Sequence, residues 1–167
     1  MVRKIEDFLT GWAYESEATL KLLNVITDDI LDKPVTGYNR TLGFVAWHVV
    51  TSNIDMAVRT GLKIDGPSLD APPPKKISEI ADTYKKVSDT LAAEIKTKWT
   101  DDSLNIENDM YGEKWKNGNT LASILGHQTH HRGQMTVLMR ILGLKTVPGV
   151  YGPSQEEWTA YGMEPKP

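Results

Sequence analysis

The chain contains no cysteine among its 167 residues. Disulfides, thiolate metal ligands and a cysteine nucleophile are therefore excluded, and any thiol chemistry must use an external thiol. The sequence also lacks an apolar run of the roughly 18 residues that a membrane span requires, and acidic side chains follow the N-terminus too early for a signal peptide. We therefore expect a cytoplasmic protein with no membrane partner.

A concentrated basic surface is missing as well. The 19 Lys and Arg residues are outnumbered by 22 Asp and Glu residues, which gives a formal net charge of -3. Nucleic-acid binding normally needs a basic face, so we expect no nucleic-acid partner. Hydrophobic residues make up 40% and charged residues 25% of the chain, as in ordinary globular proteins. The length predicts a single domain over residues 1–167.

Four segments repeat their apolar residues at intervals of three and four, the spacing of an amphipathic helix, and no segment has the pattern of a strand. The predicted helices run from Lys4 to Leu31, from an N-cap at Thr41 to Gly61, from an N-cap at Ser78 through Ile95, and from Thr120 to Gly143. This pattern predicts an all-α fold, a four-helix bundle.

The segments between the predicted helices differ in character. Residues 63–76 contain three consecutive prolines, which predicts a long extended crossover connection. Residues 99–119 are rich in Asp, Asn and Gly, with turn signals at Tyr111-Gly112 and Asn117-Gly118, and predict a loop with room for a short hairpin. Ser154 and Glu157 have capping-box spacing, which predicts a short C-terminal helix.

Histidines provide the strongest functional signal. His127 and His131 lie four residues apart within GHQTHHRGQM, so on a helix they emerge about 40° apart and one turn from each other. A third histidine, His48, could reach them only from a neighbouring helix. Three imidazoles suit zinc, nickel, copper or iron and leave coordination positions open. From spacing alone, a structural role in the core remains an alternative for a single histidine such as His48. His130 points about 100° away from His131, so it cannot easily bind the same ion.

Other residues are weaker candidates, and none is assigned a catalytic role. Gly133 costs a helix roughly 1 kcal/mol relative to alanine, which suggests close approach of another helix, although a tolerated exposed glycine is the alternative. Arg132 and Gln134 could support a ligand or form structural contacts. The candidate pocket walls are Trp47, Tyr111 and Trp158, and the candidate polar lining residues are Ser52 and Asp55. The candidates for a loop-borne base or a fourth ligand are Asp109 and Glu113.

The helical outline, the string WHVV around His48 and the string GHQTHHRGQM together resemble the DinB/YfiT-like family of candidate metalloenzymes over nearly the whole chain. The resemblance implies a divalent metal ion, zinc or nickel first and iron as a further option, held by His48, His127 and His131. It also implies a homodimer, because members of the family are often dimeric.

The reaction is less closely defined by this resemblance than the site. Some members are S-transferases that use a low-molecular-weight thiol, so the resemblance implies transfer of an external thiol to a small electrophilic substrate. Metal-dependent hydrolysis is the nearest alternative. A stress-associated bundle that binds metal or a partner without turnover is the third.

Overall fold

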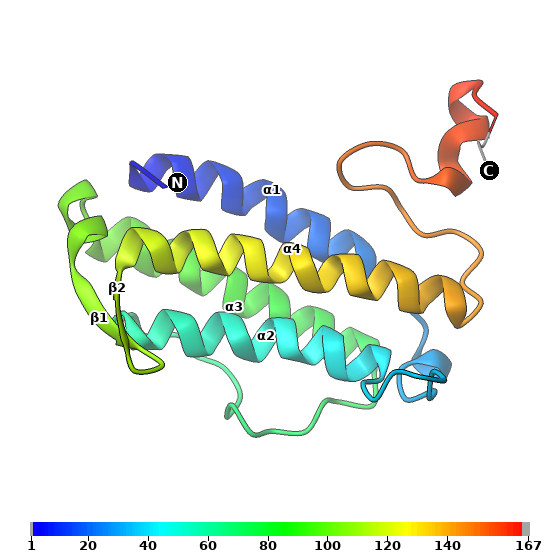
Figure 1. The fold of residues 1–167 in the computed structure, drawn as a ribbon, viewed down its shortest axis with the longest axis horizontal. Helices are drawn as coiled ribbons and strands as arrows, with labels where there is room; N and C mark the ends of the chain where they lie inside the picture. Colours follow the sequence, from blue (N-terminus) through cyan, green and yellow to red (C-terminus); the bar gives the residue numbers. More distant parts are fainter. Residues whose placement is uncertain (1, 165–167) are drawn as a thin grey trace.

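The computed structural model describes residues 2–164 and shows four long helices lying side by side (Figure 1). They are α1 (Ile5–Leu23), α2 (Leu42–Arg59), α3 (Ile77–Lys98) and α4 (Asn117–Ile141). Helices α1 and α4 run in one direction and α2 and α3 in the other. α4 packs against both α1 and α2, and α3 packs against the same two helices from the opposite side. The predicted four-helix bundle is confirmed.

The connections follow from this topology. Because α2 and α3 run in the same direction, residues 63–76 return along the whole bundle, and the predicted long crossover is confirmed (Figure 1). A short 3₁₀ helix, η2 (Asp101–Asn105), precedes an antiparallel hairpin of β1 (Glu107–Met110) and β2 (Glu113–Lys116). The short C-terminal helix is the 3₁₀ segment η3 (Gln155–Tyr161). No helix within residues 2–164 is long and apolar enough to cross a membrane.

The first helix is shorter than the apolar spacing predicts. It ends at Leu23 rather than Leu31, and a 3₁₀ turn, η1 (Asp28–Ile30), follows. Ile26, Ile30 and Leu31 are nevertheless buried, because the chain folds back beneath α2 and the Leu31 carbonyl accepts a hydrogen bond from Gly43 N–H at 2.8 Å. A turn against a neighbouring helix therefore buries the same apolar residues that a longer helix was expected to bury.

The starts of the later helices also show what tertiary contacts add. Thr41 caps α2 as predicted, since its hydroxyl accepts from Phe44 N–H at 3.1 Å. Helix α3 begins one residue before the predicted cap Ser78, and the Ile77 N–H donates to Asp28 Oδ1 of the distant η1 turn at 2.8 Å. Helix α4 begins at Asn117, within a predicted turn and three residues before Thr120. The Asn117 side chain is held by hydrogen bonds with Asn108 and Ser103.

Two apolar clusters form the core, one toward each end of the bundle. Buried polar side chains also reach the interior from all four helices, namely Thr19, Asn53, Tyr84, Ser88, Gln128 and Arg132. The Tyr84 hydroxyl donates to Gln128 Oε1 at 2.8 Å, and burial raises the pKa of Tyr84, so this phenol stays protonated. On α4, Gln128 lies directly beside His127 in the sequence.

Candidate metal centre

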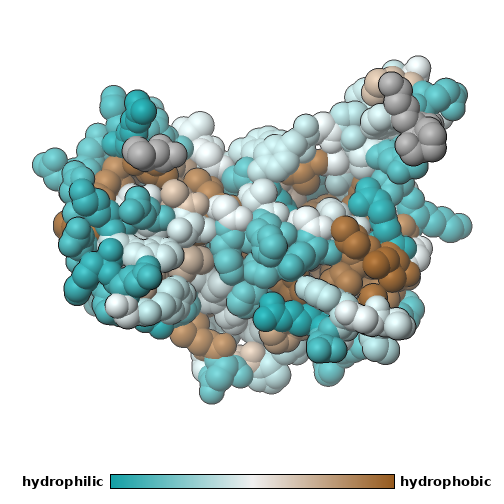
Figure 2. All heavy atoms as spheres, viewed as in Figure 1, coloured by the Kyte–Doolittle hydropathy of each residue, from teal (hydrophilic) through white to brown (hydrophobic). Residues whose placement is uncertain are grey.

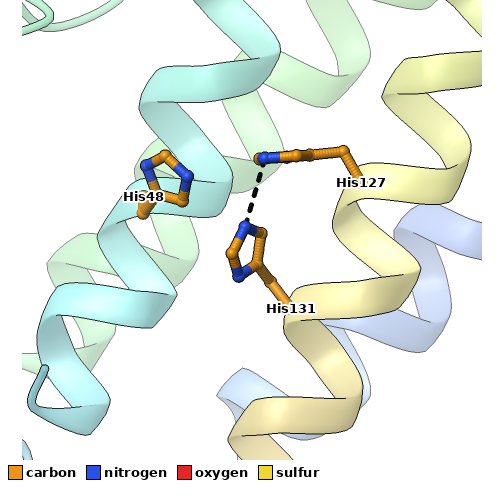
Figure 3. Close-up of side chains that lie close together, drawn as sticks. All are labelled: His48, His127 and His131. Carbon is orange, nitrogen blue, oxygen red and sulfur yellow. Dashed lines mark hydrogen bonds between the residues drawn. The ribbon is translucent and has the colours of Figure 1, made fainter.

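The three histidines converge between α2 and α4 (Figure 3). His127 and His131 lie one turn apart on α4, with 3.1 Å between their Nε2 atoms. His48 approaches from α2, and its ring centroid lies 5.2 Å from that of His127 and 4.7 Å from that of His131. Each ring offers one nitrogen, and these three atoms all lie within 4.8 Å of one another. The cluster could therefore hold one metal ion.

The spacing fits the donor chemistry. Two nitrogens that each lie about 2.0–2.1 Å from a tetrahedral zinc ion are roughly 3.3 Å apart, close to the separation of the His127 and His131 Nε2 atoms. The Nδ1 atom of His127 is buried and has no hydrogen-bond partner within the described part of the chain. Three imidazoles supply three of the four positions of a tetrahedral ion and leave one open.

The electrostatic environment keeps these rings neutral. Burial is the largest cause that lowers the pKa of all three histidines. The pKa of His127 is lowered to about 4. The neighbouring imidazoles add to this, since His131 lowers the pKa of both His48 and His127. A neutral imidazole carries the lone pair that a metal needs, so near pH 7 the cluster is ready to bind a cation without first losing protons.

Gln134 supports one of the three histidines. Its Oε1 atom lies 2.7 Å from His131 Nδ1, so an amide oxygen can accept the proton of that ring nitrogen. This contact leaves His131 Nε2 free to face His127. The Gln134 amide nitrogen lies 3.2 Å from His130 Nε2, which links the fourth histidine to the same residue. Hydrogen bonds of this kind fix the tautomer and orientation of a metal-binding histidine.

The remaining candidates from the sequence lie elsewhere. His130 belongs to no group of three metal-binding side chains in the described structure. Arg132 is buried and points toward α1, where it forms an ion pair with Glu15 and donates to the Tyr151 hydroxyl at 2.9 Å. The suggested close helix approach at Gly133 is wrong, because a Cβ atom there would meet nothing within 4 Å. Gly133 is exposed, so the alternative interpretation, a glycine tolerated on the exposed side of the helix, is correct.

The two loop-borne carboxylates are engaged within the hairpin. Asp109 Oδ1 accepts from Gly112 N–H at 3.3 Å, and Glu113 Oε2 accepts from the Trp115 indole at 2.9 Å. Neither belongs to the metal-binding group of the described residues. The structure therefore offers neither residue as a fourth ligand.

An open groove of about 760 Å³ begins at His48 and His127 and is lined by residues of α2, α4 and the hairpin. Its lining residues come from both helices, the crossover and the hairpin, namely His48, Thr51, Ser52, Asp55, Met56, Leu69, Tyr111, Trp115, Ser123, Gly126 and His127. Among the predicted pocket residues, Tyr111, Ser52 and Asp55 line this groove. Trp47 lines an adjoining cavity, and the Trp158 indole donates to Pro153 in the C-terminal segment.

Sequence reasoning missed several groove residues. Leu69, Met56 and Trp115 look in the sequence like ordinary apolar residues of a connection, a helix and a loop. Gly126 stands immediately before His127, and its position inside a strongly predicted helix was the one available signal. The groove joins segments that are far apart in the chain, so local spacing does not reveal it.

The support given by Gln134 can be tested through metal affinity. Gln134→Leu removes the acceptor for His131 Nδ1–H and is expected to weaken zinc binding about 10- to 100-fold in a competition titration with a chelator. Gln134→Glu keeps an acceptor oxygen and should retain most of the affinity. Wild-type affinity in the leucine variant would show that the contact does not orient the ring.

The lowered pKa values predict how acid acts on the metal-free protein. As the pH falls below about 6.5, the unfolded chain binds a proton at His127 while the folded ring stays neutral, so stability falls until about pH 4, the pKa of His127 in the folded protein. Because the His127 ring is only partly buried, solvent screening keeps its contribution to this loss at about 2 kcal/mol or less. Urea unfolding between pH 7 and 4 should show a shallower decline for His127→Phe than for wild type. Parallel pH profiles would contradict the assignment.

Comparisons with known proteins show the family to which the chain belongs. The sequence profile described as "DinB family" matches residues 1–166. The "Uncharacterized protein YrdA" of Bacillus subtilis is 43% identical over 164 residues, which cover 98% of each chain. The crystal structure of a DinB-like protein from Bacillus cereus shares 46% identity with a TM-score of 0.85, covering 90% of this chain and 100% of the other.

A more distant structure shows the same fold. The crystal structure of YjoA, a DinB-like protein of Bacillus subtilis, has a TM-score of 0.67 at 20% identity and covers 86% of this chain and 96% of its own. The family profile extends over both helices that carry the histidines. The chain belongs to the DinB family.

Proposed function

We propose that this protein is a metal-dependent enzyme that binds a divalent ion through His48, His127 and His131 and transfers a small external thiol to a small electrophile. The observation that carries the proposal is a cluster of three neutral imidazoles, two of which, His48 and His127, line one end of an open groove. A divalent ion held with vacant positions lowers the pKa of a bound thiol or water. Imidazole accepts zinc, nickel or iron, so the donor set leaves the identity of the ion open.

The chain's own residues serve three purposes in this proposal. His48, His127 and His131 hold the ion, and Gln134 orients His131 through its Nδ1 proton. The groove provides room for the substrates beside the ligands. Because the chain has no cysteine, the sulfur nucleophile must come from a small molecule. Three protein ligands and an adjacent groove favour catalysis over a purely structural site, which is normally closed by four ligands.

The surroundings of the ligands favour a thiol over water as the nucleophile. Within the described residues, Asp55 is the only carboxylate that lines the groove. Its Oδ1 atom pairs with Arg59 at 2.9 Å and its Oδ2 atom accepts from the Tyr111 hydroxyl at 2.8 Å. A hydrolase gains from a free carboxylate base to deprotonate water. A thiol has an ordinary pKa near 8.5, so it needs less assistance near neutral pH.

Conjugation of cysteine to chlorodinitrobenzene tests the proposal. In this reaction a C–S bond forms, the C–Cl bond breaks, and chloride and the thiol proton are released. The rate of conjugation, followed by the absorbance of the thioether product, should be about 100-fold higher with zinc- or nickel-loaded protein than with metal-free protein. His127→Ala should abolish this difference. His130→Ala is the matched control, because it changes a neighbouring histidine outside the cluster and should retain metal and activity.

Other outcomes favour the alternatives. Equal conjugation rates with and without metal would refute thiol transfer. Metal-dependent cleavage of an ester without thiol transfer would favour the hydrolase. A broad substrate screen without any metal-dependent turnover would favour a non-catalytic metal-binding bundle.

The expected homodimer is a further proposal, supported by exposed apolar side chains on α4. Val137 and Ile141 are 56% and 60% exposed, and Figure 2 shows apolar surface over the C-terminal half of this helix. Sedimentation velocity at micromolar concentration should show a dimer that Val137→Lys converts to monomer. Val58→Lys, at an exposed valine on α2, should leave the dimer intact. A wild-type monomer would refute the expectation.

A further inference from the structure

Gly126 occupies a position where no packing contact requires glycine. It lies within α4, where glycine lowers helix stability relative to alanine. A Cβ atom at this position would meet no atom of residues 2–164 within 4 Å. At Gly43, in contrast, a Cβ atom would lie 3.1 Å from the Leu31 carbonyl, so packing explains that glycine. The backbone of Gly126 borders the groove immediately beside His127, and any side chain there would narrow it.

The far end of the groove is built around another costly position. Tyr111 and Gly112 form the two-residue turn between β1 and β2, with φ values of 58° and 89°. The left-handed conformation suits glycine or asparagine far better than tyrosine. Tyr111 is held there by contacts with α2, since its hydroxyl donates to Asp55 and the Arg59 guanidinium lies 4.5 Å from its ring centroid. These contacts fix an aromatic ring as a wall of the groove.

The lining between these two ends carries little net charge. The Asp55 carboxylate is paired with Arg59, and burial together with Asp55 raises the pKa of the Tyr111 phenol to about 12, so the phenol remains neutral. The other walls are the apolar side chains of Met56, Leu69 and Trp115 and small hydroxyl groups. A charged ligand would therefore meet no unpaired opposite charge on the side chains that line the groove, whereas a flat apolar group could pack against the two aromatic rings.

We propose that this groove binds the electrophile as an uncharged, flat, largely apolar molecule, and that Gly126 sets the width of the groove beside the histidines. The volume of about 760 Å³ lies within the range of small-molecule sites. The ligand lies with its reactive atom toward His48 and His127 and its apolar part toward Tyr111 and Trp115. That this ligand is the electrophile of a reaction rests on the function proposed above.

Binding of chlorodinitrobenzene without any thiol tests the groove separately from the reaction. The chain has no cysteine to consume the probe, and dinitrophenyl groups quench tryptophan fluorescence. Zinc-loaded wild type should show saturable quenching, which Trp115→Phe should largely remove. Gly126→Leu should weaken binding at least about tenfold while zinc content stays unchanged. In metal-free protein, where only the side chains of the groove act on the ligand, the anion dinitrobenzoate should bind more weakly than the neutral probe.

Gly133→Leu is the matched control. Gly133 lies two turns further along α4 and is also exposed. Among the described residues nothing lies within 4 Å of a Cβ atom built there, and Gly133 does not line the groove. This variant should bind the probe as wild type does. Gly126→Ala tests whether weaker binding could come from a folding defect. Alanine favours the helix, so this variant should have a Tm about 2–4 °C higher than wild type and should still bind the probe more weakly.

The possible results separate this inference from the proposed function. If metal-dependent conjugation occurs and Gly126→Leu binds the probe like wild type, the groove assignment is overturned and the function stands. If no thiol is transferred but Gly126→Leu selectively blocks the probe, the function fails and the groove stands as a site for a flat neutral ligand. Equal weakening by Gly126→Leu and Gly133→Leu, or tighter binding of the anion by metal-free protein, overturns the inference.

Discussion

The packing of α2 against α4 is the constraint on which the chemistry of this protein depends. Helix geometry alone brings His127 and His131 together, since they stand one turn apart on α4. His48 joins them only because α2 lies against α4 with the correct rotation and level. A shift of α2 by one residue would turn His48 by about 100° and remove it from the cluster. The core that holds these two helices in register is therefore part of the site.

Adjacent residues of α4 serve different neighbours because the helix turns between them. His131 faces α2 and the other histidines, whereas Arg132 points toward α1 and pairs with Glu15. Gln134 returns to the side of His131 and contacts its outer ring nitrogen. Tyr151 of the C-terminal segment forms hydrogen bonds with Arg132 and Glu15, so this segment is held to the face of the bundle away from the histidine cluster. One short sequence string thus connects the cluster, the interior and the C-terminal segment.

The groove shows the same dependence on distant segments. Its two ends are defined by backbone choices that lower local stability, a glycine inside α4 and a left-handed tyrosine in the hairpin turn. The conformational preferences of the backbone disfavour both residues at these positions, and their roles become apparent only from the contacts and the open space of the folded molecule. The paired Asp55 and Arg59 connect the hairpin to α2, so the same helix supplies one histidine of the cluster and anchors the far wall of the groove.

The sequence by itself determined the helical class, the crossover, the Thr41 cap and the pairing of His127 with His131, because each depends on neighbours within about one helical turn or on the rigidity of proline. Tertiary structure decided where α1 ends, that Asp28 binds the first N–H of α3, which side chains line the groove, and that His48 reaches the other two histidines. These features join residues tens of positions apart. They are set by how the helices pack, which periodicity along one helix does not specify.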